Sequence, residues 1–248
     1  MAFNRSASAS DEAIRARSLL RYRSRVVGYD RSCGPTWPIR ERAVSGLHLQ
    51  PGQRVLDVGC GTGLSLALLR RAVGDAGLVF GCDQSPQMLA LARQRVAAAG
   101  WRNVHLFEVP AHELGLPEPV DALLFHYTHD ILRSPMAVER LLQCARPGAA
   151  VAVAGIKYFP RWLAPLNLWV YFKNLGYNGS PGQLAAPWDR IAPRLAGWQR
   201  SSTQFGMGYL AFGRVDAQAL GAAAPARLAD KGLAPAVVQA LGSAIGAR

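Results

Sequence analysis

Between residues 54 and 155, short apolar runs alternate with longer amphipathic stretches. Continuous apolar runs of this length are typical of strands buried on both faces, and the amphipathic stretches are typical of helices that cover them. We therefore expect strands at 54–58, 78–82, 104–109, 120–125 and 149–155, with helices at 64–73, 86–99 and 137–145. Repeated strand–helix units predict a mostly parallel sheet with helices on both faces.

After residue 155 the pattern changes. An insert of about residues 157–188 is rich in Trp, Tyr, Phe and Pro, a helix is expected at 187–195, and two β-like runs follow at 198–205 and 208–215. These two runs are close enough to form an antiparallel hairpin. The predicted fold class is α/β, with a Rossmann-like seven-stranded sheet that ends in this hairpin.

The rest of the chain flanks a central domain at 51–216. Residues 1–50 are expected to form a helical arm or lid, with helices at about 10–27 and 38–46. Residues 217–248 are rich in Ala and are expected to be a helical tail.

Composition limits the partners. With 28 Lys and Arg against 16 Asp and Glu, the net charge is +12, which attracts phosphorylated metabolites, nucleic acid or an acidic membrane face. A charge spread over solvated faces is the alternative. The four cysteines lack metal-ligand spacing, so we expect no metal site and reduced thiols. Without a secretory signal or an uninterrupted spanning segment, the expected location is cytoplasmic, with peripheral membrane contact as an option.

A glycine-rich turn directly follows the first strand. Residues 55–63 read V-L-D-V-G-C-G-T-G. Glycines there let the backbone approach a ligand closely, and the N–H groups that begin the next helix can face its polar atoms. Leu64 stands where a dinucleotide fold has its third glycine, which argues against NAD.

Asp83 ends the second strand, where a carboxylate can accept hydrogen bonds from both hydroxyls of a ribose. The alternative is that Asp83 caps the helix that begins near Pro86. Glycine turn and carboxylate together predict a ligand that contains a nucleoside.

These segments resemble the class I S-adenosylmethionine-dependent methyltransferases. The resemblance rests on residues 55–63 and on 81–89, G-C-D-Q-S-P-Q-M-L, and it covers about residues 22–155. Residues 146–148, R-P-G, resemble the family's Lys-Pro-Gly-Gly turn. The pair Tyr29-Asp30 resembles the N-terminal Tyr-Asp of its small-molecule and lipid branches, such as quinone-biosynthesis and phospholipid N-methyltransferases.

The resemblance implies S-adenosylmethionine as cofactor. The glycines would cradle its methionine end, Asp57 would orient its amino group, Asp83 would hold the ribose, and Gln84 and Met88 would border the adenine. The full implied set is Asp57, Gly59, Cys60, Gly61, Gly63, Asp83, Gln84, Met88 and Ala111.

One departure from the family lies after the third strand. The family usually has an Asp there that accepts from the adenine amino group, whereas this chain has Pro110. Glu108 or a backbone group would have to replace that contact.

Two catalytic candidates, His126 and His129, follow the fourth predicted strand, and a third, Tyr29, precedes the first strand. His126 and His129 lie at the carboxyl edge of the predicted sheet, where such folds bind ligands. We expect His129 to act as a general base where the acceptor arrives protonated, and Tyr29 to close the site over the cofactor. The alternative is that His126 packs on the cofactor and His129 caps the following helix.

The predicted function is methyl transfer to an O, N or S atom of a small or medium apolar metabolite, in a pocket roofed by the aromatic insert. The alternative for the insert is a second small core. Three alternatives concern function: a membrane-surface phospholipid or quinone methyltransferase, a non-catalytic S-adenosylmethionine-binding protein, and nucleic-acid methylation. The last is not expected, because the chain lacks an Asn/Asp-Pro-Pro-Tyr motif, a Pro-Cys nucleophile and an appended RNA-binding module.

Overall fold

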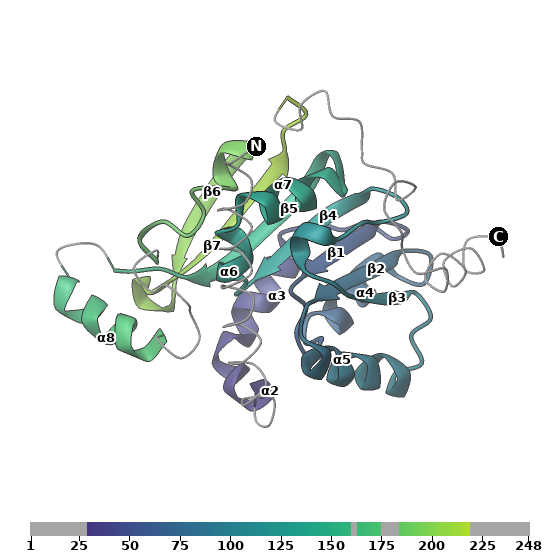
Figure 1. Cartoon of the computed structure of the whole chain (residues 1–248), viewed down its shortest axis with the longest axis horizontal. Coiled ribbons are helices and arrows are strands. Elements are labelled where there is room, and N and C mark those ends of the chain that lie inside the picture. The colour runs from purple at the N-terminus through teal and green to yellow at the C-terminus, as the bar shows by residue number, and fades with distance from the viewer. Residues whose placement is uncertain (1–28, 160–162, 175–183, 219–248) are drawn as a thin grey trace, which may run out of the picture.

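A seven-stranded sheet forms the centre of the molecule (Figure 1). The computed structural model describes residues 29–159, 163–174 and 184–218. The strands lie in the order β3-β2-β1-β4-β5-β7-β6. Their bounds are β1 Arg54–Val58, β2 Leu78–Asp83, β3 Val104–Glu108, β4 Val120–His126, β5 Ala145–Ile156, β6 Leu195–Thr203 and β7 Gly208–Val215.

Strand directions follow the prediction. Strands β1 to β5 pair in parallel, and β7 pairs antiparallel with both β5 and β6. The predicted Rossmann-like sheet with an antiparallel terminal hairpin is therefore confirmed. The carboxyl ends of the parallel strands meet at one edge, which is where such folds bind ligands.

Helices cover both faces of the sheet (Figure 1). Apolar side chains of α3, α4 and α5 pack on one face, and those of α7 pack on the other. The bounds are α2 Tyr29–Ser32, α3 Trp37–Ser45, α4 Leu66–Val73, α5 Pro86–Ala98, α6 His129–Leu132, α7 Pro135–Gln143 and α8 Ala164–Asn174, with short 3₁₀ turns η1 Gly34–Thr36, η2 Ala111–Glu113, η5 Ala192–Arg194 and η6 Gln204–Gly206.

Strand alternation divides the core in two. Val55 packs with the helices of the α3 face, whereas Leu56 and Val58 pack with α7 on the opposite face. All three side chains are fully buried. Because both faces are covered, the central strands consist of continuous apolar runs, and this is why the sequence located them.

The structure differs from the prediction at two places. Residues 187–195 form turns and the short η5 in place of a helix, because Pro193 lacks an N–H group and restricts the residue before it. The insert contains a helix, α8, that was not predicted. The expected helix at 10–27 and all of the tail beyond 218 lie outside the described residues. Among the helices that are described, none is long and apolar enough to cross a membrane.

Candidate functional site

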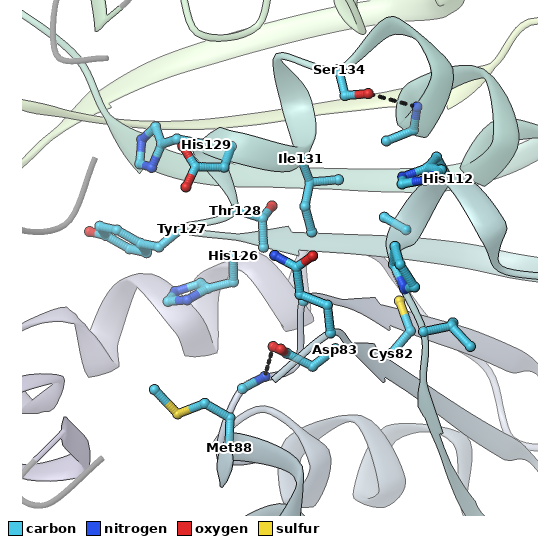
Figure 2. A pocket seen from close by; sticks show the side chains of 18 of the residues that line it. Cys82, Asp83, Met88, His112, His126, Tyr127, Thr128, His129, Ile131 and Ser134 are labelled. Carbon is cyan, nitrogen blue, oxygen red and sulfur yellow. Dashed lines mark hydrogen bonds between the residues drawn. The ribbon is translucent and has the colours of Figure 1, made fainter. Parts of the chain in front are cut away.

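A pocket opens at the carboxyl ends of β1, β2, β3 and β4 (Figure 2). Each strand contributes the loop that follows it, and α2, α5 and α7 complete the walls. The lining residues are Tyr29, Gly59, Gly61, Cys82, Asp83, Gln84, Met88, Val109, Pro110, Ala111, His112, His126, Tyr127, Thr128, His129, Asp130, Ile131, Ser134 and Ala137. The pocket therefore lies where the sheet order predicts a ligand site.

The three glycines of the turn after β1 have different neighbours, although all three have positive φ. A Cβ at Gly59 would lie 2.7 Å from the Thr128 side chain, and one at Gly63 would lie 2.7 Å from Leu66. A Cβ at Gly61 would have no atom within 4 Å. Gly59 and Gly63 thus allow close packing, whereas Gly61 leaves open space in the pocket wall.

Asp83 holds the glycine turn in place. Its Oδ2 accepts a hydrogen bond from the Gly61 N–H at 3.0 Å, and its Oδ1 accepts one from the Ser85 N–H at 2.8 Å. Burial raises the pKa of the Asp83 carboxyl, and these backbone hydrogen bonds oppose that rise. The N-cap of α5 is Ser85, whose Oγ accepts from the Met88 N–H, so Asp83 does not cap this helix.

His126 ends β4 at the pocket with an unsatisfied ring atom. Its side chain is buried, and Nε2 finds no hydrogen-bond partner among the described residues. Desolvation, with contributions from Arg40 and His129, lowers the pKa of His126 well below its usual value, so the ring is neutral at physiological pH. Tyr127, next in the chain, has a positive φ of 61°, a strained conformation of the kind that gathers at functional sites.

His129 lies at the start of α6 and contacts the main chain at the end of β5. Its Nε2 lies 2.8 Å from the Ile156 nitrogen and 3.1 Å from the Ile156 oxygen. Either tautomer therefore commits Nε2 to Ile156, and only Nδ1 remains for another partner. Burial lowers the pKa of His129 as well. The side chain does not cap α6, whose N-cap is Thr128.

Comparison with known proteins identifies a domain family that part of this chain resembles. A model of the methyltransferase domain family matches residues 55–148. Demethylmenaquinone methyltransferase from Geobacillus kaustophilus is 40% identical over 79 residues, which are 32% of this chain and 34% of that protein. Phosphatidylethanolamine N-methyltransferase from Cereibacter sphaeroides is 33% identical over 141 residues, which are 56% of this chain and 66% of that protein.

A solved structure supports the same fold. The SAM-dependent methyltransferase from Aquifex aeolicus aligns with a TM-score of 0.51 and 21% identity, over 71% of this chain and 89% of that one. Residues 55–148 thus match the methyltransferase domain family, and the sheet has the fold of an S-adenosylmethionine-dependent methyltransferase. The chain spans about half or less of the length of the first curated relatives that it matches.

The cofactor of this family, S-adenosylmethionine, fits the residues present. The open space at Gly61 admits a ligand beside the main chain, and the Asp83 carboxylate ends β2 in the same pocket. Of the residues that the resemblance assigned to the cofactor, those that line the pocket are Gly59, Gly61, Asp83, Gln84, Met88 and Ala111. The catalytic candidates Tyr29, His126 and His129 line it as well.

Asp57, Cys60 and Gly63 do not line the pocket. Asp57 alternates with its strand neighbours and so points to the α3 face, while Cys60 is buried under the turn, where its Sγ would lie 3.0 Å from a Cβ at Gly81. Gly63 packs against α4 and α5. Alternation along β1 explains the position of Asp57, and the tight turn after β1 explains the positions of Cys60 and Gly63.

Burial of Asp57 creates an electrostatic pair with α3. The carboxyl is 2% exposed, and desolvation raises its pKa to about 7, although nearby Arg40 lowers it and Asp83 raises it further. Arg40 is itself buried, and its Nη1 donates to the Ser65 Oγ at 2.5 Å. Sequence alone did not indicate Arg40, because a helix periodicity does not say which strand residue the helix faces.

The wall after β3 contains no carboxylate in the usual adenine position. Glu108 is not among the lining residues, and its carboxylate accepts from the Arg93 guanidinium at 3.0 Å at the surface. The wall here is formed by Val109, Pro110 and Ala111, with His112 beside them. In the described residues, main-chain groups and His112 are therefore the polar groups that follow β3 at this wall.

The N-terminal arm reaches the glycine turn through Asp30. Thr62 Oγ1 donates to Asp30 Oδ1 at 2.6 Å, and Arg95 Nη2 donates to Asp30 Oδ2 at 2.7 Å. Arg95 Nε also donates to the Thr62 carbonyl at 3.2 Å. This network brings α2, with Tyr29, to the pocket. The Tyr-Asp pair was the sequence signal for it, but the partners of Asp30 were not predictable.

The described part of the aromatic insert is not among the residues that line the pocket. Trp188 packs on β7, with its ring centroid 4.9 Å from that of Tyr209, and the Arg200 guanidinium lies 3.8 Å from the Trp188 ring centroid. Trp188 therefore adds to the core, which was the alternative to a lid, whereas Trp169, Tyr171 and Phe172 on α8 are exposed.

Proposed function

We propose that this chain transfers the methyl group of S-adenosylmethionine to an O, N or S atom of a small or medium apolar metabolite. One observation carries the proposal. A single pocket joins the turn at Gly59 and Gly61 and the Asp83 carboxylate to a second wall with His126 and His129. Cofactor and acceptor can therefore meet in one partly enclosed space.

The pocket residues have distinct roles in this proposal. Asp83 would accept from the ribose hydroxyls, the open space beside the main chain at Gly61 would admit the methionine end, and the Val109–Ala111 wall would border the adenine. When bound, the cofactor supplies a methyl group already activated by its sulfonium. The protein then has to align the acceptor and exclude water, which can supply most of the rate enhancement.

The histidines lie on the wall available to the acceptor. We propose that His126 accepts a hydrogen bond or a proton from the acceptor at Nε2, because that buried atom has no other partner among the described residues. His129 would assist through Nδ1, since its Nε2 is engaged with Ile156. Tyr29, brought to the pocket by the arm, would close the cofactor side.

A second candidate is methylation of a quinone or phospholipid at a membrane surface. It is supported by the relatives, which are a demethylmenaquinone and a phosphatidylethanolamine methyltransferase, and by exposed apolar side chains on α8. A non-catalytic S-adenosylmethionine-binding protein is the alternative from another class. Turnover of the cofactor with any acceptor distinguishes it from both enzymes.

Calorimetry with S-adenosylmethionine tests the cofactor site. Asp83→Ala is expected to weaken binding by about 1.5–3 kcal/mol, the range for a charged hydrogen-bond partner. Asp121→Ala is the matched control, because Asp121 also accepts a backbone N–H, that of Arg54 at 2.8 Å, but from the start of β4. Unchanged affinity in a folded Asp83 variant would refute the assignment.

Methyl-labelled cofactor tests the acceptor class. The enzyme is incubated with cell extract, and the label is followed into lipid, aqueous metabolite and nucleic-acid fractions. We expect label among small molecules or lipids. Label mainly in nucleic acid would overturn the proposed substrate class, and no transfer into any fraction would favour the non-catalytic alternative.

A further inference from the structure

Two residues with strained backbones share one hydrogen bond beside the pocket. Tyr127, which lines the pocket, has φ 61°, and Gln204, on the tip of the β6–β7 hairpin, has φ 50°. The Tyr127 hydroxyl donates to the Gln204 Oε1 at 3.3 Å. Positive φ in a non-glycine residue carries a conformational cost, and such costs gather at functional sites. Strain on both sides of one hydrogen bond therefore points to a role for this contact beyond packing.

The surrounding chain holds both partners in place. The Tyr127 N–H donates to the Ala154 carbonyl on β5 at 2.8 Å. At the hairpin tip, the Lys157 Nζ donates to the Gly206 carbonyl at 2.6 Å, two residues beyond Gln204. The contact thus joins the loop after β4 to the terminal hairpin, across 77 positions of the chain.

Gly208, at the start of β7, leaves room for the Gln204 carboxamide. A Cβ at Gly208 would lie 2.7 Å from the Gln204 Oε1 and 2.3 Å from the Thr203 Oγ1. A side chain at this position would therefore displace the oxygen that receives the Tyr127 hydroxyl. The glycine is part of what lets Gln204 reach the pocket wall.

The Tyr127 ring lies beside two histidine rings on one wall of the pocket (Figure 2). Its centroid is 4.8 Å from that of His126, at an interplanar angle of 56°, and 6.2 Å from that of His129, at 73°. Aromatic rings prefer such tilted and edge-to-face arrangements. Because Gln204 fixes the Tyr127 hydroxyl, this wall presents a positioned aromatic surface with the buried Nε2 of His126 next to it.

The three rings of this wall are uncharged. Burial lowers the pKa of His126 and of His129, so the neutral form of each predominates at physiological pH. Burial also raises the pKa of Tyr127 to about 12, which keeps its hydroxyl protonated. Among the described residues that line the pocket, none is Lys or Arg.

The charged groups near this wall already have partners. Asp130 lines the pocket, but its carboxylate pairs with Arg133 at 3.3 Å. Arg40 acts on His126 and Tyr127 from α3, yet it does not line the pocket, and it donates to the Ser65 Oγ. A charged acceptor would therefore lose hydration at this wall without gaining an opposite charge that is still unpaired, which is costly.

We propose that Tyr127, positioned by Gln204, selects an uncharged acceptor that carries a planar ring and a hydroxyl group. The acceptor ring packs on Tyr127, and its hydroxyl bonds to the His126 Nε2, which has no partner among the described residues. This inference rests on the proposed methyl transfer and narrows the acceptor of that function. It favours an uncharged metabolite over a lipid with an ammonium headgroup.

Three matched probes test the acceptor class by calorimetry on the full chain loaded with S-adenosylhomocysteine, which has no methyl group to transfer. The probes are para-phenylphenol, para-phenylbenzoate and para-phenylbenzylammonium, which share two rings and differ in charge. We expect para-phenylphenol to bind about tenfold more tightly than either ion, because the wall does not compensate the lost hydration of a charge. Equal or tighter binding of either ion would overturn the proposal.

Variants of the pair test whether Gln204 positions Tyr127. Tyr127→Phe and Gln204→Leu remove opposite ends of one hydrogen bond, so each should raise the Kd of para-phenylphenol about three- to tenfold, and the double variant should raise it no further. Gln204→Glu keeps an oxygen that accepts from Tyr127 and should restore wild-type binding. Gln199→Ala is the matched control, since Gln199 is exposed on β6 of the same hairpin, and it should bind as the wild type does.

Additive losses in the double variant, or weak binding in a folded Gln204→Glu variant, would show that Gln204 does not act through Tyr127 and would overturn the proposal. Binding of S-adenosylhomocysteine is measured first on every protein. Lost probe selectivity with intact S-adenosylhomocysteine binding contradicts this inference alone. A wild-type chain that does not bind S-adenosylhomocysteine contradicts the proposed function as well.

Discussion

Thr62 donates a short hydrogen bond to Asp30, and this contact fastens the N-terminal arm to the turn that faces the pocket. Thr62 is buried, while the Arg95 guanidinium that completes the network is partly exposed. The two residues are 32 positions apart, so the arm position depends on the folded sheet and not on local chain preferences.

Breaking this network should weaken cofactor binding. Asp30→Asn replaces the carboxylate that receives both Thr62 and Arg95, and we expect the Kd for S-adenosylmethionine to rise about three- to tenfold, the range for a partly exposed hydrogen bond. Arg95→Gln should act in the same direction. Arg93→Gln is the matched control, because Arg93 lies on the same helix but pairs with Glu108 at the surface. Equal affinities in all three variants would show that the arm does not position the site.

Substitution of three glycines by alanine should distinguish effects on cofactor binding from effects on the stability of the fold. Gly61→Ala and Gly100→Ala both place a Cβ in open space at a positive φ, so each should cost about 1–2 kcal/mol of stability. Of these two glycines only Gly61 lines the pocket, so Gly61→Ala but not Gly100→Ala should also weaken cofactor binding. Gly63→Ala should destabilise most, because its Cβ would clash with Leu66. Melting curves and calorimetry on the three variants test this, and an equal loss of affinity in Gly100→Ala would refute it.

Turnover should show no histidine titration above neutral pH. Burial lowers the pKa of both His126 and His129, so the neutral form of each ring predominates at the ordinary histidine pKa, and kcat should fall on the acid side of it. His126→Ala should lower kcat about a hundredfold if the ring accepts a proton. His129→Ala should also lower the melting temperature, since it loses the Ile156 contact. An inflection at or above the ordinary pKa would contradict the burial argument.

Asp57 should make stability depend on pH. Its folded pKa of about 7 lies above the ordinary pKa of an aspartate side chain, so the folded state favours the protonated carboxyl. The cost of burying the ionised form is absent below the unfolded pKa and complete above the folded one. Between these two pKa values the cost grows by about 1.4 kcal/mol as the pH rises by one.

Denaturant unfolding of wild type and Asp57→Asn, without cofactor, measures this cost. The stability of the variant relative to wild type should increase with pH between the two pKa values and then level off. A pH-independent part of the difference in unfolding free energy reports the loss of the charge beside Arg40. The change of that difference with pH therefore reports the titration of Asp57. A pH-independent difference would show that the carboxyl does not titrate in this range.

Local patterns located most of the sheet. The predicted bounds of β1 agree with the structure at both ends, because Val55 to Val58 form a continuous apolar run apart from one buried carboxyl. The predicted helix at 187–195 was wrong, because Pro193 lacks the N–H group that the interior of a helix needs. Helix α8 was missed because its exposed aromatic side chains do not form the one-sided stripe that periodicity detects.

The sequence by itself determined the order of strands and helices, the glycine turn and the placement of Asp83 at the end of β2, because each depends on residues close together in the chain. Tertiary structure alone decided that Asp57 faces Arg40 and that Asp30 fastens the arm to Thr62. It also decided that His129 is engaged with Ile156. The residues of these pairs are 17 to 32 positions apart, and only the packing of α2, α3 and α6 against the sheet brings them together.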